Sequence, residues 1–262
     1  MAASDTADER ISYLKDIYTS VVFLTRLPAP GWPEAASRKL STAMWAFPLA
    51  GVLVATIAGL VYAVCDALGL PVYISALFTV VALIIATGGL HEDGLSDLAD
   101  GVWGGSDPAK RLTIMSDSRI GAFGAIALIV SVSVRAAAIA SIGQPLFVLG
   151  ALVATAAVSR AVMPAVMTFG TPAKADGLGA SAGKPGAAVW GSALILAAVI
   201  CATAAPTGWF ACLIAAAAGA ALVSWFARRN LGGYTGDVLG AAQQVAELFA
   251  LTVIASVIAE AG

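Results

Sequence analysis

Four acidic residues lie close together in the sequence, at a spacing that a helix would gather on one face. Asp93, Asp97 and Asp100 are four and then three residues apart, and Glu92 flanks them. On a helix with 3.6 residues per turn, the three aspartates point within roughly 60° of one another. Like charges at this spacing repel unless a ligand compensates them. Mg²⁺ takes carboxylate oxygens together with substrate phosphates, so the pattern predicts a Mg²⁺–diphosphate site with these four residues as metal ligands.

A solvated acidic loop is the competing interpretation of this cluster, and two features disfavour it. The cluster follows the apolar run from Phe78 to Ala86 directly, which places it at a membrane boundary where charge is costly. It is also rich in glycine, which lets the backbone approach a ligand closely. A Ca²⁺ hand fits poorly, because its twelve-residue ligand pattern is absent.

Basic residues downstream are candidates for holding the far end of a diphosphate. Arginine offers phosphate oxygens a planar fork, and lysine offers a point charge. The positive-inside rule would explain basic residues at a membrane surface equally well. Arg135 and Arg160 lie within apolar segments, where a charge must face the protein interior, a partner or a cavity. Arg135 falls toward the far half of its segment, and the candidate substrate-binding residues here are Lys110, Arg111, Asp117, Arg119 and Arg160.

A second polar element opens the last apolar segment. Its helix start supplies free N–H groups that favour anions, so Thr235 is a further candidate for substrate binding. Asp237 could complete the metal shell, act as a base, or cap the helix. Gly240, Gln244 and Glu247 continue roughly one face of that helix, and we expect this polar stripe to line the bundle interior or a cavity.

The single histidine, His91, directly precedes the acidic cluster. Histidine titrates near neutral pH, so His91 could assist proton transfer or contact a phosphate. A lone histidine beside acids can equally be a hydrogen-bonded neighbour. We therefore treat it as a candidate catalytic residue with a structural alternative.

The framework around these groups is apolar: 60% of the 262 residues are hydrophobic and 11% are charged. One aqueous core could not bury so many apolar residues. Seven segments approach the length of about 20 residues that a spanning helix needs: 43–65, 71–88, 121–142, 146–168, 187–205, 208–227 and 238–259. We expect an all-α polytopic membrane protein with one domain over residues 1–262. Residues 1–42 would form a cytoplasmic or interfacial segment, and 88–120 a cytoplasmic acidic active-site loop.

The distribution of Lys and Arg tests this count of spans. Twelve of the fourteen lie outside the seven segments, and they occupy alternate connections. The positive-inside rule then predicts a cytoplasmic N-terminus, an outer C-terminus and an acidic cluster on the cytoplasmic side. A net charge of −2 argues against a nucleic-acid partner. The lipid bilayer is the expected partner, and a homo-oligomer is compatible with the sequence.

Residues 11–27 predict an amphipathic helix that Pro28 and Pro30 terminate, lying along the membrane interface or re-entering it. The three cysteines, Cys65, Cys201 and Cys212, lie in apolar stretches without CxxC spacing. They are interpreted as packing residues.

Three runs of the sequence are distinctive: Thr87 to Gly101 (TGGLHEDGLSDLADG), Ile114 to Gly124 (IMSDSRIGAFG) and Thr235 to Ala241 (TGDVLGA). They resemble motifs of the cobalamin synthase family of ribazoletransferases. Leu24 to Pro28, Phe47 to Gly51, and Ser159-Arg160 ahead of Gly177 to Gly179 also resemble the family. The resemblance covers nearly the whole chain in order.

The resemblance implies a late step of cobalamin nucleotide-loop assembly in the bacterial cytoplasmic (inner) membrane. Adenosylcobinamide-GDP would donate phosphocobinamide to α-ribazole or its 5′-phosphate, with release of GMP and a requirement for Mg²⁺. The acids would hold Mg²⁺ on the diphosphate, and Arg119, with Lys110 or Arg160, would contact phosphate oxygens. Asp100 or Asp237 would accept the proton of the attacking ribazole hydroxyl.

Two other functions are compatible with parts of the pattern. A CDP-alcohol phosphotransferase or prenyltransferase also holds metal and diphosphate with helical aspartates, but the Ala-Arg pair and later Asp pair of the former are absent at the required spacing. A transporter would use Arg135, Arg160 and Glu247 as a charge pathway. The acids cluster at one membrane boundary instead of mid-membrane, which favours an enzyme.

Overall fold

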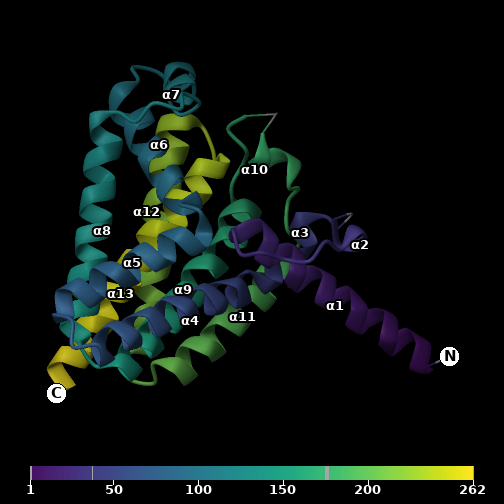
Figure 1. The fold of residues 1–262 in the computed structure, drawn as a ribbon. Helices are drawn as coiled ribbons and strands as arrows, with labels where there is room; N and C mark the ends of the chain where they lie inside the picture. Colours follow the sequence, from purple (N-terminus) through teal and green to yellow (C-terminus); the bar gives the residue numbers. More distant parts are fainter. Residues whose placement is uncertain (1, 37, 175–176, 262) are drawn as a thin grey trace.

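The computed structural model describes residues 2–36, 38–174 and 177–261, and these residues are almost entirely helical (Figure 1). The elements in chain order are α1 (Ala2–Leu24), α2 (Pro33–Ala36), α3 (Leu40–Ala43), the 3-10 turn η1 (Met44–Ala46), α4 (Phe47–Ala67), α5 (Val72–Thr87), α6 (Leu90–Gly104), α7 (Pro108–Ile114), α8 (Ala122–Ile142), α9 (Pro145–Phe169), α10 (Leu178–Ser181), α11 (Ala187–Ala204), α12 (Trp209–Leu231) and α13 (Gly236–Ala261). The all-α prediction is confirmed.

Six helical stretches are long and apolar enough to cross a membrane. They are Leu40–Ala67, Ala122–Ile142, Pro145–Phe169, Ala187–Ala204, Trp209–Leu231 and Gly236–Glu260. The pair α5 and α6 passes the same test only when taken together, and it is bent by 92°. Counting this pair as one span gives seven, the predicted number. The other six have ends within about four residues of those expected, whereas the pair continues to Gly104, beyond the predicted end at residue 88.

The bend between α5 and α6 comes from two consecutive glycines. Gly88 and Gly89 have φ angles of +67° and +71°, a left-handed conformation that other residues adopt only with strain. Gly88 ends α5, and its N–H bonds back to carbonyls of that helix's last turn. The chain then starts α6 in a new direction. The segment expected to be an acidic loop, 88–120, therefore consists mainly of two helices, α6 and α7.

The connections sort to two ends of the bundle as the charge pattern predicted. The turns α4–α5, α8–α9 and α11–α12 and the C-terminus lie toward the lower left of Figure 1. The α7 and α10 segments, whose connections carry lysine or arginine, lie at the opposite end. One end of the bundle is thus free of basic residues in its connections.

Helix α1 lies beside the bundle and points its N-terminus away from it (Figure 1). It contacts α2, α3 and α4, and it ends at Leu24, ahead of Pro28. The helix begins earlier than the predicted residue 11 but ends within the predicted range. Leu24 is buried, whereas Tyr13 and Leu14 are more than half exposed, in keeping with the expected amphipathic character.

Helix α13 supports the acidic helix by very close contact. A Cβ atom added to Gly94 would lie 2.6 Å from the backbone oxygen of Asp237, and one added to Gly240 would lie 3.3 Å from that of Leu90. Small residues allow helix backbones to approach in this way. The crossing fixes α6 on the first turn of α13, so two polar segments 140 residues apart in sequence meet at one place.

Candidate active site

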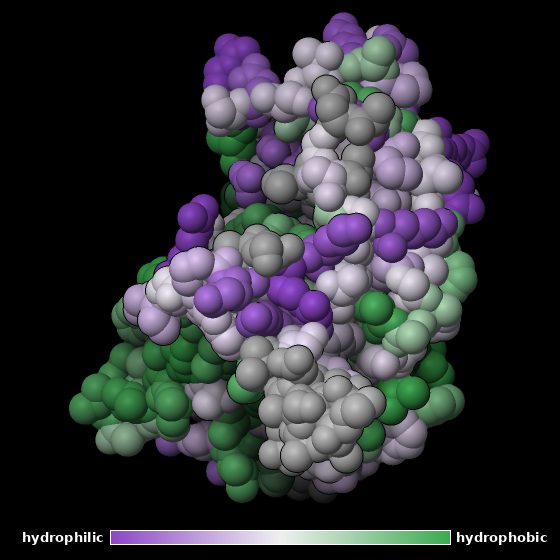
Figure 2. All heavy atoms as spheres, turned by 90° about the vertical axis from the view of Figure 1, so that its right-hand side faces the viewer, coloured by the Kyte–Doolittle hydropathy of each residue, from purple (hydrophilic) through white to green (hydrophobic). Residues whose placement is uncertain are grey.

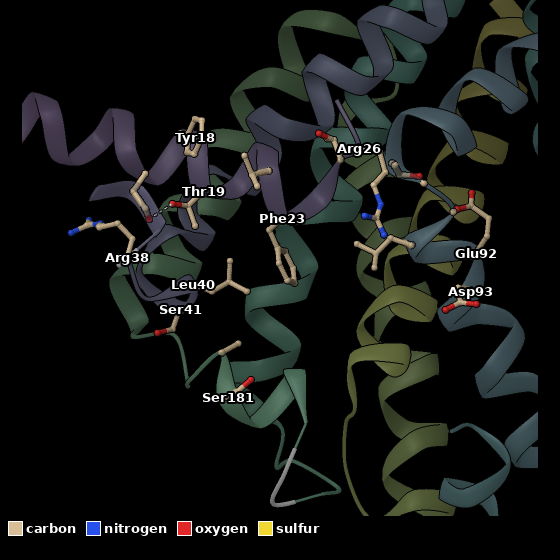
Figure 3. Close-up of a pocket in the computed structure, with 18 of the residues that line it drawn as sticks. Tyr18, Thr19, Phe23, Arg26, Arg38, Leu40, Ser41, Glu92, Asp93 and Ser181 are labelled. Carbon is tan, nitrogen blue, oxygen red and sulfur yellow. Dashed lines mark hydrogen bonds between the residues drawn. The ribbon is translucent and has the colours of Figure 1, made fainter. Parts of the chain in front are cut away.

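The acidic helix forms one wall of an open cavity of about 1550 Å³. Glu92, Asp93 and Asp97 line it from α6. The facing wall comes from α1 and the segment that leads to α3, with aromatic and basic residues such as Phe23 and Arg26. Figure 3 shows Arg26 between the labelled α1 residues and Glu92 and Asp93.

The face of the molecule with α1, α3 and α10 is hydrophilic over its upper and middle parts (Figure 2). Hydrophobic side chains gather along its lower left and right edges. This division agrees with a polar cavity that opens at one end of an apolar helix bundle. A charged substrate could enter there without crossing the apolar surface.

Asp93 and Asp97 are the acids with access to the cavity. Asp93 is exposed and Asp97 is partly buried, one turn further along α6. The charges of Asp93 and Asp237 both act on Asp97. The first turn of α13 therefore adds a third carboxylate to the neighbourhood, although Asp237 itself is not in the cavity lining.

Asp100 has a structural role that its sequence position did not reveal. Its two carboxylate oxygens accept hydrogen bonds from the backbone N–H groups of Gly121 and Gly124, at 2.7 and 2.8 Å. These N–H groups belong to the start of α8, where a helix leaves its donors unpaired and favours negative charge. Asp100 is buried. It thus anchors α6 to α8 and is a weak candidate for metal ligand or base.

Glu92 faces both the cavity and the protein interior. Its Oε1 accepts hydrogen bonds from Arg135 Nη2 at 3.0 Å and from Gln244 Nε2 at 3.1 Å. Its Oε2 is buried and has no hydrogen-bond partner among the residues that the structure describes. Arg135 was expected to face the protein interior, a partner or a cavity. It is 1% exposed and pairs with Glu92, an acid of the predicted site.

The interior contacts of Glu92 continue into a network of buried polar side chains. Glu247 lies 3.7 Å from Arg135 and 3.5 Å from Arg160, and it accepts a 2.6 Å hydrogen bond from Gln243. Gln243 also bonds Ser159 at 2.9 Å. Two arginines and two glutamates thus balance one another inside the bundle, as buried charges require. The prediction that the polar stripe of α13 lines the interior is confirmed.

His91 and Arg160 are less available to substrate than the sequence suggested. His91 is 1% exposed and Arg160 is 2% exposed, and neither lines the cavity. His91 Nε2 and Arg160 Nε are both buried, and neither has a hydrogen-bond partner in the described part of the chain. His91 is thus buried next to the acids, but the alternative of a hydrogen-bonded neighbour is not confirmed for its Nε2.

The basic residues predicted to bind phosphate are outside the cavity lining. Arg111 donates hydrogen bonds to the carbonyls of Gly105 and Asn230, which ties α7 to α12. The Arg119 side chain is 86% exposed and pairs with Asp117 at 2.7 Å. That hydrogen-bonded pair holds the pKa of the Asp117 carboxyl below its ordinary value. Lys110 is exposed, and its backbone N–H donates a hydrogen bond to the side chain of Asp107, the N-cap residue of α7.

Thr235 and Asp237 bond to each other at the start of α13. The Thr235 hydroxyl lies 3.2 Å from Asp237 Oδ2 and also accepts from the N–H of Val238 at 3.3 Å. Thr235 therefore caps α13. Asp237 is left partly buried beside the acidic helix, which suits the predicted role of a second-site carboxylate.

The four predicted metal ligands differ in their surroundings, and their role as ligands stays a prediction. Among the described residues, no three His, Cys, Asp or Glu side chains are grouped so that they could share one ion. Glu92 and Asp100 are committed to Arg135 and to the start of α8, respectively. Asp93 and Asp97 remain, and two carboxylates suit Mg²⁺ that completes its shell with water and substrate phosphate.

Sequence reasoning missed Arg26 as a site residue. The positive-inside rule was sufficient to explain a basic residue at position 26, so Arg26 was not considered as a binding residue. The sequence did contain a sign of this role: Arg26 lies in the motif from Leu24 to Pro28, where α1 ends. The proline keeps the chain from continuing as a helix, and the chain turns there toward the acidic helix. Only the fold shows that this turn meets the bend between α5 and α6.

The fold and the site together define a polytopic α-helical membrane protein with a carboxylate-bearing cavity at one end of its bundle. The family model described as cobalamin-5-phosphate synthase matches residues 16–255, so the chain belongs to that family. Its relatives include the adenosylcobinamide-GDP ribazoletransferases of Mesorhizobium japonicum and Bradyrhizobium diazoefficiens. They are 41% and 39% identical, covering 93% of this chain and 93% and 94% of their own lengths. The Brucella ovis protein of the same name is 41% identical over 93% of this chain and 97% of its own. No solved structure matches the chain.

Proposed function

We propose that the protein transfers the phosphocobinamide group of adenosylcobinamide-GDP to α-ribazole or to its 5′-phosphate, with release of GMP. The observation that carries this proposal is the near full-length match to relatives of that name, together with an acidic helix on a large polar cavity. The active site would face the cytoplasm of a bacterial inner membrane, because the basic connections lie at its end of the bundle.

Asp93 and Asp97 are the residues that would hold Mg²⁺. When bound, the ion would neutralise charge on the diphosphate and on the departing GMP. The chain contributes the position of these two carboxylates: Asp100 fixes α6 to α8, and Gly94 fixes it on α13. Because α6 is held in this way, Asp93 and Asp97 would already be in position for metal and diphosphate when the substrate binds.

The ribazole hydroxyl that attacks must lose a proton to a nearby acceptor. Asp237 is the better of the two predicted bases, since both oxygens of Asp100 already accept backbone hydrogen bonds. The Thr235 hydroxyl donates to Asp237 Oδ2 and so orients the carboxylate. The proton would then pass from the ribazole oxygen to Asp237 as the oxygen–phosphorus bond forms and the phosphorus–oxygen bond to the departing GMP breaks.

The direct test uses purified full-length protein in detergent or nanodiscs. Adenosylcobinamide-GDP, α-ribazole 5′-phosphate and Mg²⁺ are supplied, and GMP and the cobamide product are quantified. We expect the two products in equal amounts, and chelation of Mg²⁺ should stop their formation. Folded protein that releases no GMP would overturn the proposal.

A further inference from the structure

Arg26 lies opposite the acidic helix in a position fixed by the backbone. Its N–H donates a 2.8 Å hydrogen bond to the carbonyl of Ala86, in the last turn of α5. Thr25, the preceding residue, bonds back to the carbonyl of Val21 at 2.8 Å and closes the end of α1. The chain at Arg26 is therefore tied to both α1 and α5.

The side chain of Arg26 runs across the glycine bend. A Cβ atom at Gly88 would collide with the Cγ of Arg26 and lie 2.9 Å from its Nε. Gly88 thus has two functions: it adopts the left-handed conformation that turns the chain, and it leaves room for the arginine. Past this glycine, Arg26 enters the cavity lined by Glu92 and Asp93 (Figure 3).

Arg26 is the best-placed cation for an anionic substrate in this cavity. Among the described residues, the cavity lining includes three basic side chains: Arg26, Arg38 and Lys39. Arg38 is already neutralised by Asp16, at 2.6 Å, and Figure 3 shows it directed away from the acids. Carboxylates repel a diphosphate, and a facing cation would offset this repulsion together with any metal ion.

We propose that Arg26 is a substrate-binding residue whose guanidinium binds phosphate oxygens across the cavity from Asp93 and Asp97. This inference rests on the proposed function and assigns the cation that Lys110, Arg111 and Arg119 were expected to provide. The phosphate is either the diphosphate of the donor or the 5′-phosphate of the acceptor. Both present oxygens that fit the planar fork of arginine.

The kinetic test compares Arg26→Gln with Arg229→Gln, using α-ribazole and α-ribazole 5′-phosphate as acceptors. Arg229 is an exposed arginine on α12 that stacks on Trp225 and does not line the cavity. We expect Arg26→Gln to lower kcat/KM by about 10- to 100-fold, the range for a lost charge-assisted hydrogen bond. A loss with both acceptors assigns the donor diphosphate, and a loss only with the phosphorylated acceptor assigns the 5′-phosphate. Equal values for the two variants would overturn the inference.

A binding test separates a contact with substrate from a structural role. Thermal unfolding is measured for the wild type, Arg26→Gln and Arg26→Met, without ligand and with inorganic diphosphate, α-ribazole or α-ribazole 5′-phosphate. Methionine keeps an aliphatic stem against Gly88 without the charge. We expect the wild type to be stabilised by diphosphate or by the phosphorylated acceptor, and both variants to lose that shift. If the variants keep the ligand-induced shift in unfolding temperature, the inference is wrong, whatever their unfolding temperature without ligand. It is also wrong if neither diphosphate nor α-ribazole 5′-phosphate stabilises the wild type.

The two proposals fail in different ways. If the wild type releases no GMP, the proposed function fails, while the binding test still reports on Arg26. If the wild type turns over and Arg26→Gln matches Arg229→Gln, only the role of Arg26 is lost.

Discussion

The two faces of α6 use the same kinds of side chain for different purposes. On the cavity face, Asp93 and Asp97 accept no hydrogen bond from any part of the chain that the structure describes. On the interior side, Glu92, which also borders the cavity, pairs with Arg135, and Asp100 accepts two backbone N–H groups. Charge inside an apolar bundle is tolerated where partners surround it. The difference between the faces therefore separates residues that hold the helix from residues that are available to a ligand.

Removing the charge from the cavity face should have the largest effect on turnover. The double variant Asp93→Asn/Asp97→Asn should lower kcat/KM by about 10⁴-fold or more, since the contacts to the charged substrate act in the transition state. Its unfolding temperature should stay level or rise slightly, because two like charges on one helix face are gone. GMP release and thermal unfolding in detergent measure the two quantities. Turnover within tenfold of the wild type would show that the cavity face is not the reactive one.

Removing a partner on the interior face should instead affect stability first. Arg135→Met leaves Glu92 and Glu247 buried without their shared cation, which should cost about 3–5 kcal/mol of unfolding free energy. Denaturant titration of the purified protein gives this value, with Arg229→Met as an exposed control. If Arg135→Met is as stable as the control but inactive, Arg135 belongs with the cavity residues.

The Asp100→Asn variant tests whether Asp100 holds the helix in place or takes part in the reaction. In Asp100→Asn the amide NH₂ group cannot accept one of the two α8 hydrogen bonds, and the loss should cost about 1–3 kcal/mol. Activity measured well below the unfolding temperature should fall less than in the aspartate double variant. An unchanged stability with complete loss of turnover would restore Asp100 to the metal or base role that the sequence predicted.

The smallest effect is expected at Arg119, which the sequence placed among the phosphate ligands. Its side chain is exposed and pairs only with Asp117 among the contacts seen. Arg119→Gln should change kcat/KM by less than about threefold, since exposed ion pairs contribute little. A loss as large as that expected for Arg26→Gln would mean that the segment around Arg119 closes over the cavity during turnover.

The spans were predictable because hydrophobic length and basic connections are local properties of the sequence. The spacing also predicted that the three aspartates share a helix, which is correct. It did not predict that they differ in surroundings: Asp93 and Asp97 line the cavity, whereas Asp100 is buried against the start of α8. The partners of buried charges were not predictable, because Arg135 meets Glu92 across 43 residues only through the packing of α8 on α6. Arg26 was missed for the same reason. Its place in the site depends on a bend at Gly88 that glycine permits but does not dictate.

The shortness of α5 has a consequence for the surrounding lipid. Its 16 residues rise about 24 Å, less than the roughly 30 Å of a typical hydrocarbon layer. A crossing by α5 alone would therefore end at the glycine bend before it spanned the hydrocarbon layer. Such hydrophobic mismatch is relieved when the bilayer thins locally. The mouth of the cavity would then be sensitive to acyl-chain length, and the membrane's thickness would become one of the parameters that set access to the site.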